Sequence, residues 1–196
     1  SRVVAIVDDA YVVIDRLASD KPHRFSFSFY PAGPVIATPG LSFTPYAKFA
    51  EEGATYAAVS NPAIAKGVSA WTIEYQVGKT NSAHLRGILD GDGELIQGTT
   101  WSGWYPAQVP VFLARRQADS VACVQVLEPG PPYPVTDLRT LPLTAEGKPV
   151  PPSQGMAVSL TTDKGVFLLI DCDLPGVKRA GSVETADTLW VGKVTP

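Results

Sequence analysis

The sequence has few of the features that mark several classes of protein. It contains 2 Cys and 2 His in 196 residues, and 18% of its residues are charged. No apolar run approaches the ~18 residues of a membrane-spanning helix, and the N-terminus lacks the basic-then-apolar pattern of a secretory signal. No basic run is longer than the pair Arg115 and Arg116, and the net charge is −3. The sequence therefore predicts neither a nucleic-acid nor a membrane partner.

The sequence also lacks the motifs of common catalytic and cofactor sites. It has no G-x-S-x-G nucleophile motif, no paired-cysteine motif and no phosphate-binding loop. The two histidines, His23 and His84, lie far apart in sequence, and we expect structural roles for both, with His23 pointing toward the core or a sheet end beside Phe25. We predict no catalytic residue, no bound metal and no cofactor.

The two cysteines, Cys123 and Cys172, lie in apolar, strand-like runs. A cysteine in such a run is usually a small buried hydrophobic residue, so we expect two free thiols, with Cys172 facing inward. A disulfide between neighbouring strands is the alternative.

The stretch Asp90–Glu94, DGDGE, has carboxylates at alternate positions, which can converge on a calcium ion. An EF-hand needs a glutamate further along its loop, whereas Glu94 is followed directly by the strand-like Leu95 and Ile96. Asp-Gly pairs adopt positive φ at low cost, so we expect a hairpin turn here.

The sequence is rich in turn residues and in strands of alternating polarity. Gly and Pro number 17 and 18. Apolar and polar residues alternate along His23–Tyr30, as in a strand with one core face. Val3–Val7 and Tyr11–Leu17 flank a turn, as do Ala157–Leu160 and Val166–Asp171, and both patterns are typical of antiparallel hairpins. The chain is predicted to be all-β, one antiparallel two-sheet β-sandwich domain over residues 1–196.

Two stretches depart from this pattern. Ala47–Val59 has some helical character, but Gly53 interrupts it, so we expect irregular structure. Glu128–Gly155 is rich in proline, which cannot donate a backbone hydrogen bond. We expect it to be a long surface connection across an edge or end of the sheets, within the same domain, rather than a central strand.

Two segments resemble the β-sandwich domain of heparinase II/III-type polysaccharide lyases. In Ala10–Tyr30, AYVVIDRLASDKPHRFSFSFY, a strand ending in an Asp-Arg pair leads through a short loop to a His-initiated alternating strand. In Val109–Pro129, VPVFLARRQADSVACVQVLEP, a basic strand is followed by a hydrophobic strand that ends at a proline. The two segments stand in the order that this family would require.

This resemblance implies a supersandwich-like fold and a role beside a larger helical domain. In the family, the sandwich follows a helical barrel, the polysaccharide lies between the two, and the helical part supplies most residues for β-elimination. The chain would then be the C-terminal part of a larger periplasmic or extracellular protein, with its upstream helical domain and an acidic polysaccharide or oligosaccharide as partners. Ser28 and Tyr30 occupy the positions where many members have a histidine pair, which argues against a metal.

Candidate carbohydrate-binding residues follow from the polar strand faces and the aromatic cluster. Arg24, Tyr30 and one of Arg115 or Arg116 are expected to neutralise or orient a uronate, the other arginine being a solvated edge charge, and Ser28 is a further carbohydrate-binding candidate. The aromatic candidates, which could stack on sugar rings, are Trp101, Trp104 and Tyr105. Packing in the core or at an edge is the default for these rings, and for Trp101 we expect a loss of stability on truncation.

Two functions remain from the sequence. The first is the sandwich domain of a polysaccharide lyase, which lines the substrate cleft and is inactive without the helical domain, because no side chain here is an evident base at neutral pH. The second is a non-catalytic carbohydrate-binding or interaction module of the same fold.

Overall fold

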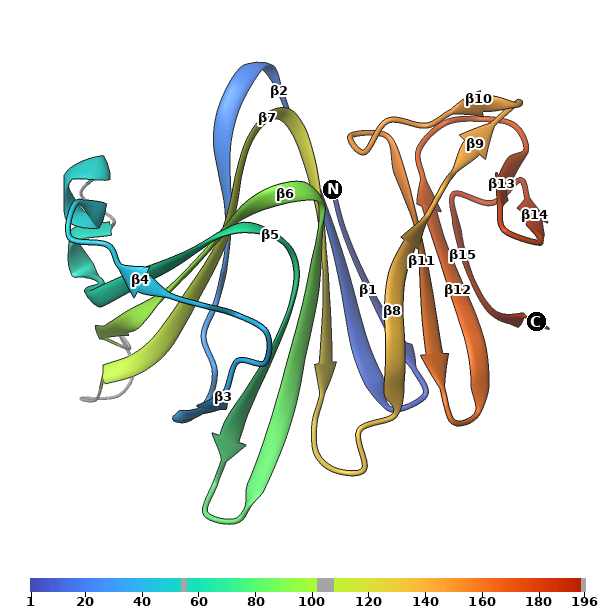
Figure 1. Ribbon diagram of the computed structural model, residues 1–196. Coiled ribbons are helices and arrows are strands. Elements are labelled where there is room, and N and C mark those ends of the chain that lie inside the picture. Colours follow the sequence, from blue (N-terminus) through green and yellow to red (C-terminus); the bar gives the residue numbers. More distant parts are fainter. Residues whose placement is uncertain (54–55, 102–107, 195–196) are drawn as a thin grey trace.

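The computed structural model describes residues 1–53, 56–101 and 108–194, and its regular structure is almost entirely β-strand (Figure 1). The long and medium strands are β1 (Arg2–Val7), β2 (Ala10–Phe29), β5 (Ser60–Val77), β6 (Asn81–Trp101), β7 (Gln108–Glu128), β8 (Val135–Leu141), β11 (Gly155–Thr162), β12 (Gly165–Cys172) and β15 (Leu189–Val194). The short strands are β3 (Val35–Ala37), β4 (Thr44–Pro45), β9 (Thr144–Ala145), β10 (Lys148–Pro149), β13 (Lys178–Ala180) and β14 (Val183–Thr185). All strand pairs are antiparallel, so the predicted fold class is confirmed.

The largest sheet has seven strands in the order β1-β2-β7-β6-β5-β3, with β4 paired to β5. Its four long strands β2, β5, β6 and β7 bend, so that the two halves of the sheet turn toward each other (Figure 1). One core cluster takes residues from both halves, including Phe29 and Phe112 from one and Trp71 and Cys123 from the other. This cluster therefore fills the inside of the bend.

The expected hairpin at Asp90–Glu94 is wrong, because β6 continues through this stretch. The pairing of β6 with β7 instead skips from Leu89 to Glu94, which marks an irregularity inside one long strand. The glycines here allow close approach: a Cβ on Gly93 would lie 2.3 Å from the carbonyl oxygen of Arg115. The Asp-Gly pairs thus allow the sheet to bend and do not reverse the direction of the chain.

A second sheet, in the order β15-β12-β11-β8, packs on the half of the large sheet that contains β1 and the start of β2 (Figure 1). The shared core cluster joins Val12, Ile14 and Val124 of the large sheet to Val158 and Leu169 of the second sheet. The two sheets form the predicted sandwich. A third, small sheet has the order β10-β9-β13-β14.

The two other predicted hairpins are confirmed, but the two strands expected within Ala10–Tyr30 and within Val109–Pro129 are in each case one continuous strand, β2 and β7. β1 and β2 are joined by Asp8 and Asp9, which have φ values of 46° and 65°, the left-handed geometry of a tight type I′ turn. β11 and β12 pair from Gly155 with Cys172 to Thr162 with Gly165.

The proline-rich stretch contains more structure than expected. Between Pro134 and Pro142, where no proline interrupts the chain, residues form β8, which pairs with β11. β8 lies at the edge of its sheet, so the prediction that this stretch holds no central strand agrees with the structure. The prediction of a purely surface connection was wrong because seven donor-bearing residues suffice for an edge strand.

Cys123 and Cys172 are free and buried, so the alternative of a disulfide is wrong. They belong to different core clusters, Cys123 inside the bend of the large sheet and Cys172 on the outer face of the second sheet. Burial raises the pKa of the Cys123 thiol, which keeps it protonated and unreactive.

The stretch expected to be irregular contains two short 3₁₀ helices, η1 (Phe49–Glu52) and η2 (Tyr56–Ala58). The fully buried Phe49 packs with Ile64, Ile96 and Leu113 on the outer side of the bent sheet. No helix in the described part of the chain is long and apolar enough to cross a membrane.

Candidate functional site

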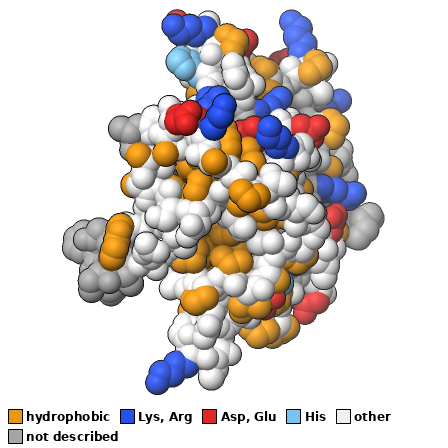
Figure 2. Space-filling view, turned by 60° about the vertical axis from the view of Figure 1, so that its left-hand side comes forward, with side chains coloured by type: hydrophobic (Ala, Val, Ile, Leu, Met, Phe, Trp, Pro, Cys, Tyr) orange, Lys and Arg blue, Asp and Glu red, His pale blue; other side chains and the backbone are white. Residues whose placement is uncertain are grey.

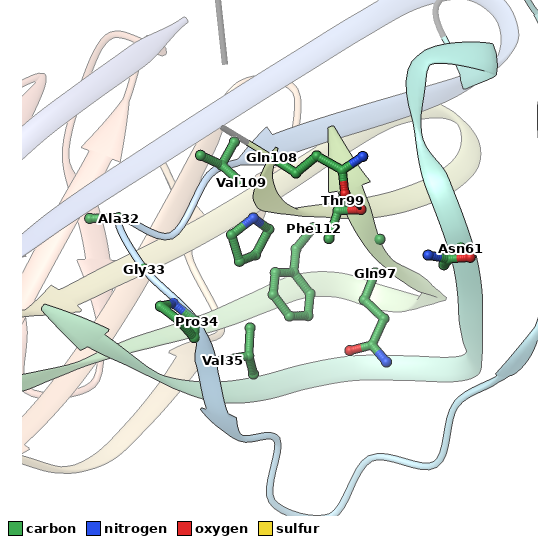
Figure 3. A pocket seen from close by; sticks show the side chains of 12 residues that line it. Ala32, Gly33, Pro34, Val35, Asn61, Gln97, Thr99, Gln108, Val109 and Phe112 are labelled. Atoms are coloured by element: carbon green, nitrogen blue, oxygen red, sulfur yellow. Dashed lines mark hydrogen bonds between the residues drawn. The ribbon is translucent and has the colours of Figure 1, made fainter. Parts of the chain in front are cut away.

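An uncharged hollow lies at one end of the large sheet, with a volume of about 870 Å³. Twelve residues line it: Ala32, Gly33, Pro34, Val35, Asn61, Gln97, Gly98, Thr99, Gln108, Val109, Pro110 and Phe112. We call it the amide hollow, because its polar side chains are three amides and one hydroxyl. The Phe112 ring lies at its centre, between the Ala32–Val35 segment on one side and Asn61 on the other (Figure 3).

The floor of the amide hollow is built by cross-strand pairs of β6 and β7. Gln97 pairs with Phe112, and Thr99 pairs with Pro110. The Thr99 hydroxyl donates to the Gln108 side-chain oxygen at 3.2 Å. Because strand side chains alternate between faces, this ladder of every second residue presents one continuous surface.

Trp101 ends this ladder, as the cross-strand partner of Gln108 and two residues beyond Thr99. Alternation places its side chain on the same face as the hollow, and 66% of Trp101 is exposed. The expectation that Trp101 packs against the protein was wrong, because the ring belongs to the last residue of a strand and nothing covers most of its surface in the described structure. Trp104 and Tyr105 lie outside the described residues.

Tyr30 and Ser28 are exposed at the end of β2. Tyr30 is 59% exposed and directly precedes the segment that forms one wall of the amide hollow. Ser28 pairs with Leu113 on the outer side of the bent sheet and lines neither this hollow nor the next.

A second, polar hollow of about 390 Å³ brings together three of the predicted arginines. Its lining is Arg24, Lys66, Gly67, Asp92, Gly93, Glu94, Arg115, Arg116 and Gln117, and we call it the arginine hollow. It forms where the pairing of β6 with β7 is interrupted. Lys and Arg side chains gather with carboxylates toward the upper end of the molecule, above a more hydrophobic middle (Figure 2).

The arginines of this hollow are already paired with carboxylates. Arg24 Nη1 lies 2.6 Å from Glu52, and Arg116 Nη1 lies 2.6 Å from Asp90. Arg115 is 1% exposed and donates to Glu52 and, at 2.6 Å, to Glu94. An anionic ligand would have to compete with these carboxylates for each guanidinium.

The expectation of one groove-facing arginine and one edge arginine was wrong. Both Arg115 and Arg116 line the arginine hollow, and β7 is a central strand of its sheet. Both arginines lie where the pairing of β6 with β7 is interrupted. Arg115 also packs against the rings of Tyr46, Phe49 and Tyr56, and its guanidinium carbon lies 5.4 Å from the Phe49 ring centre.

The groups bound to Arg115 beside the arginine hollow also shift one another's pKa. Burial raises the pKa of Glu52, but hydrogen bonds from Tyr46 and Arg115 outweigh it and hold the pKa below its usual range. The hydrogen bond to Glu52 raises the pKa of Tyr46.

Across the described residues, no group of three or more His, Cys, Asp and Glu side chains is placed to hold a metal ion.

The histidines lie apart from both hollows. His23 is exposed within β2, where the pairing with β7 resumes after an irregularity, so the expectation that it points toward the core or a sheet end is wrong. His84 stacks on Tyr133 with 3.4 Å between ring centres, and its two ring nitrogens lie 3.8 Å from Glu128 and 3.9 Å from Glu74. Burial lowers the pKa of His84, with Arg86 acting in the same direction and the two carboxylates opposing.

We expect His84 to make the protein less stable in mild acid. Because the pKa of His84 in the folded state lies below the ordinary 6.5, the unfolded chain binds the proton first as pH falls. His84→Gln should remove this loss, so its stability relative to the wild type should increase below pH 6.5, by at most about 1.4 kcal/mol per pH unit. Urea unfolding of both proteins at pH 7.5 and 5.5 measures the difference. A constant difference between the two pH values would contradict the assignment.

The amide residues Asn61, Gln97 and Gln108 were not predicted as site residues. Each is an isolated polar residue within or beside a strand, and only the pairing of distant strands brings them together. Comparison with protein-family models and with curated proteins finds no match to this chain.

Proposed function

We propose that this chain is a carbohydrate-contacting β-sandwich module without catalytic activity of its own. The observation that carries the proposal is the amide hollow with the exposed Trp101 on the same face of β6. Sugars present hydroxyl groups around a ring with apolar C–H faces, and this surface offers both kinds of contact.

The chemistry of the hollow suits that ligand class. The amides of Asn61, Gln97 and Gln108 each offer a donor and an acceptor, which matches hydroxyl groups that both donate and accept. An exposed indole provides a flat apolar face on which a sugar ring can stack. A concave surface with few polar groups among apolar ones is the usual form of a small-ligand site.

The resemblance to heparinase II/III-type lyases supports a more specific role. In that role the module forms one wall of a cleft for an acidic polysaccharide, beside an upstream helical domain, in a periplasmic or extracellular protein. The side chains near the two hollows include no histidine, and their arginines are held by carboxylates. The base of an elimination would therefore come from outside the module.

Trp101→Ala is expected to weaken oligosaccharide binding by about 1 to 2 kcal/mol, through loss of the stacking face. The same change should alter the free energy of unfolding by no more than about 0.5 kcal/mol, because the ring is largely exposed. Calorimetric titration with a panel of neutral and acidic oligosaccharides measures binding, and urea unfolding measures stability. Arg24→Ala is the matched control, an exposed polar change at the arginine hollow that should leave binding at the amide hollow intact.

Salt dependence and turnover complete the test. Binding at the uncharged hollow should change little between low and high salt, whereas binding at the arginine hollow should fall steeply. The chain alone should produce no ultraviolet-absorbing unsaturated uronate from heparan sulfate or alginate. Such turnover would overturn the non-catalytic assignment, and absence of binding to the whole panel would overturn the carbohydrate assignment.

A further inference from the structure

The sandwich has four sheet edges, and three of them carry features that discourage pairing with another chain. β3 has three residues. β8 is bounded by Pro134 and Pro142 and carries the exposed Asp137 and Arg139, while β15 presents the exposed Lys193. β1 differs: it is a regular six-residue strand, RVVAIV, whose single charge is the terminal Arg2.

The outward edge of β1 has open backbone groups. The two-residue turn at Asp8 and Asp9 makes Val7 and Ala10 a hydrogen-bonded pair, so the N–H and C=O groups of alternate residues point toward β2. Those of Arg2, Val4 and Ile6 point outward, and no backbone partner outside the β1–β2 ladder is present for them in the described chain.

The side chains beside these open groups are apolar and exposed. Val4 is 61% exposed and Ile6 is 67% exposed. Tyr11, the cross-strand partner of Ile6, is 44% exposed and widens the same surface onto β2. An exposed apolar strand with open hydrogen-bonding groups is a template for addition of another strand.

We propose that β1 pairs antiparallel with β1 of a second copy of this chain, joining the two large sheets across a two-fold axis. The outward-facing residues fix the register, with Val4 opposite its own symmetry mate and Arg2 opposite Ile6. Each of these pairs would exchange backbone hydrogen bonds, because only the outward-facing residues have free groups.

The charge pattern of β1 favours a second copy over an unrelated strand. In this register Arg2 never faces Arg2 of the other copy, and its guanidinium remains bound to Asp15 of its own chain at 2.6 and 2.9 Å. Val4 meets Val4 of the other copy on the axis, and this side chain is exposed in the single chain. The surface is therefore self-complementary, as a two-fold interface requires. Because one short strand contributes less than the roughly 800 Å² per partner of a standard interface, we expect a concentration-dependent equilibrium.

Cross-linking tests the register directly. The Cα atoms of a hydrogen-bonded antiparallel pair lie about 5.5 Å apart, within the range of a disulfide. Val4→Cys should therefore form a disulfide-linked dimer under mild oxidation, visible on a non-reducing gel. Ile36→Cys, at a position 55% exposed on the β3 edge, is the matched control and should remain monomeric at the same protein concentration. The native cysteines are buried and should not contribute.

Sedimentation velocity over a range of concentrations tests association of the unmodified chain. Ile6→Lys places a lysine opposite Arg2 of the other copy and should raise the dimer dissociation constant roughly tenfold, whereas Ile6→Glu should not. Thermal unfolding confirms that both variants are folded. A wild-type chain that remains monomeric at all concentrations, or equal effects of the two substitutions, would overturn the proposal. So would cross-linking of the Val4→Cys variant no faster than the control.

Discussion

Arg16→Ala is expected to lower the free energy of unfolding by about 3 to 5 kcal/mol, because it leaves a buried carboxylate without its cation. The Arg16 side chain has no exposed surface, and its Nε donates to Asp171 at 2.7 Å, where Asp171 is 4% exposed. Its other nitrogens donate to the Ser153 carbonyl and to Asp173. Arg16 lies on β2 and Asp171 on β12, so this network joins the two sheets of the sandwich.

Urea unfolding of the wild type and the variant measures this loss, which should also lower Tm by on the order of 10 °C. Arg179→Ala is the control, since its pair with Glu184 has 67% and 55% exposed side chains and should contribute no more than about 1 kcal/mol. The double variant Arg16→Met, Asp171→Leu removes both charges and should recover part of the loss. A loss for Arg16→Ala no greater than for the control would show that the network does not stabilise the fold.

The sequence allowed the strands and their hairpins to be predicted because both depend on local patterns. Two aspartates between β1 and β2 adopt the left-handed geometry of a tight turn, and alternation along β2 places Phe27 and Phe29 in the core. Local signals were less reliable where they had two meanings. The Asp-Gly pairs at Asp90–Glu94 allow either a turn or close backbone approach, and only the neighbouring strand decides between them.

The Asp15 and Arg16 pair shows a limit of reading residues along a motif. Adjacent strand positions face opposite sides, so Asp15 binds Arg2 within its own hairpin, while Arg16 crosses to the second sheet. Asp171 lies 155 positions further along the chain, and no periodicity links the two residues. The sequence showed Asp15 and Arg16 only as a motif shared with a known family, whereas the structural role of each residue depends on how the two sheets pack.

The candidate site was predictable only in part for the same reason. Trp101 was identified as an aromatic candidate, and its exposure follows from its place at the end of β6. The amide hollow is formed by residues from the segment after β2 and from four strands, β3, β5, β6 and β7. A single glutamine in a strand gives no indication of such a site, because cross-strand neighbours depend on register.

Arg115→Met is expected to lower the free energy of unfolding by about 3 kcal/mol, toward the lower end for a broken buried ion pair. The smaller figure reflects the partial exposure of its carboxylate partners, 16% for Glu52 and 33% for Glu94. Arg115 also fills the space beside the rings of Tyr46, Phe49 and Tyr56. This predicted binding residue should therefore act mainly by holding η1 against the sheet.

The pH dependence of that loss identifies its cause. The pKa of Glu52 lies below its ordinary 4.5 in the folded state, so the stabilisation from its ionised form is present above pH 4.5 and is lost as pH falls through the folded value. The difference between wild type and Arg115→Met should consequently shrink below pH 4.5. Urea unfolding at pH 7 and at pH 3.5 measures this difference. Arg24→Ala is the control, because it removes the exposed partner of the same glutamate, and it should lower the free energy of unfolding by less than about 1 kcal/mol at either pH. A loss of stability for Arg115→Met that is independent of pH would assign the effect to packing against the aromatic rings. If Arg115→Met instead left the free energy of unfolding nearly unchanged but abolished sugar binding, Arg115 would belong to the binding site.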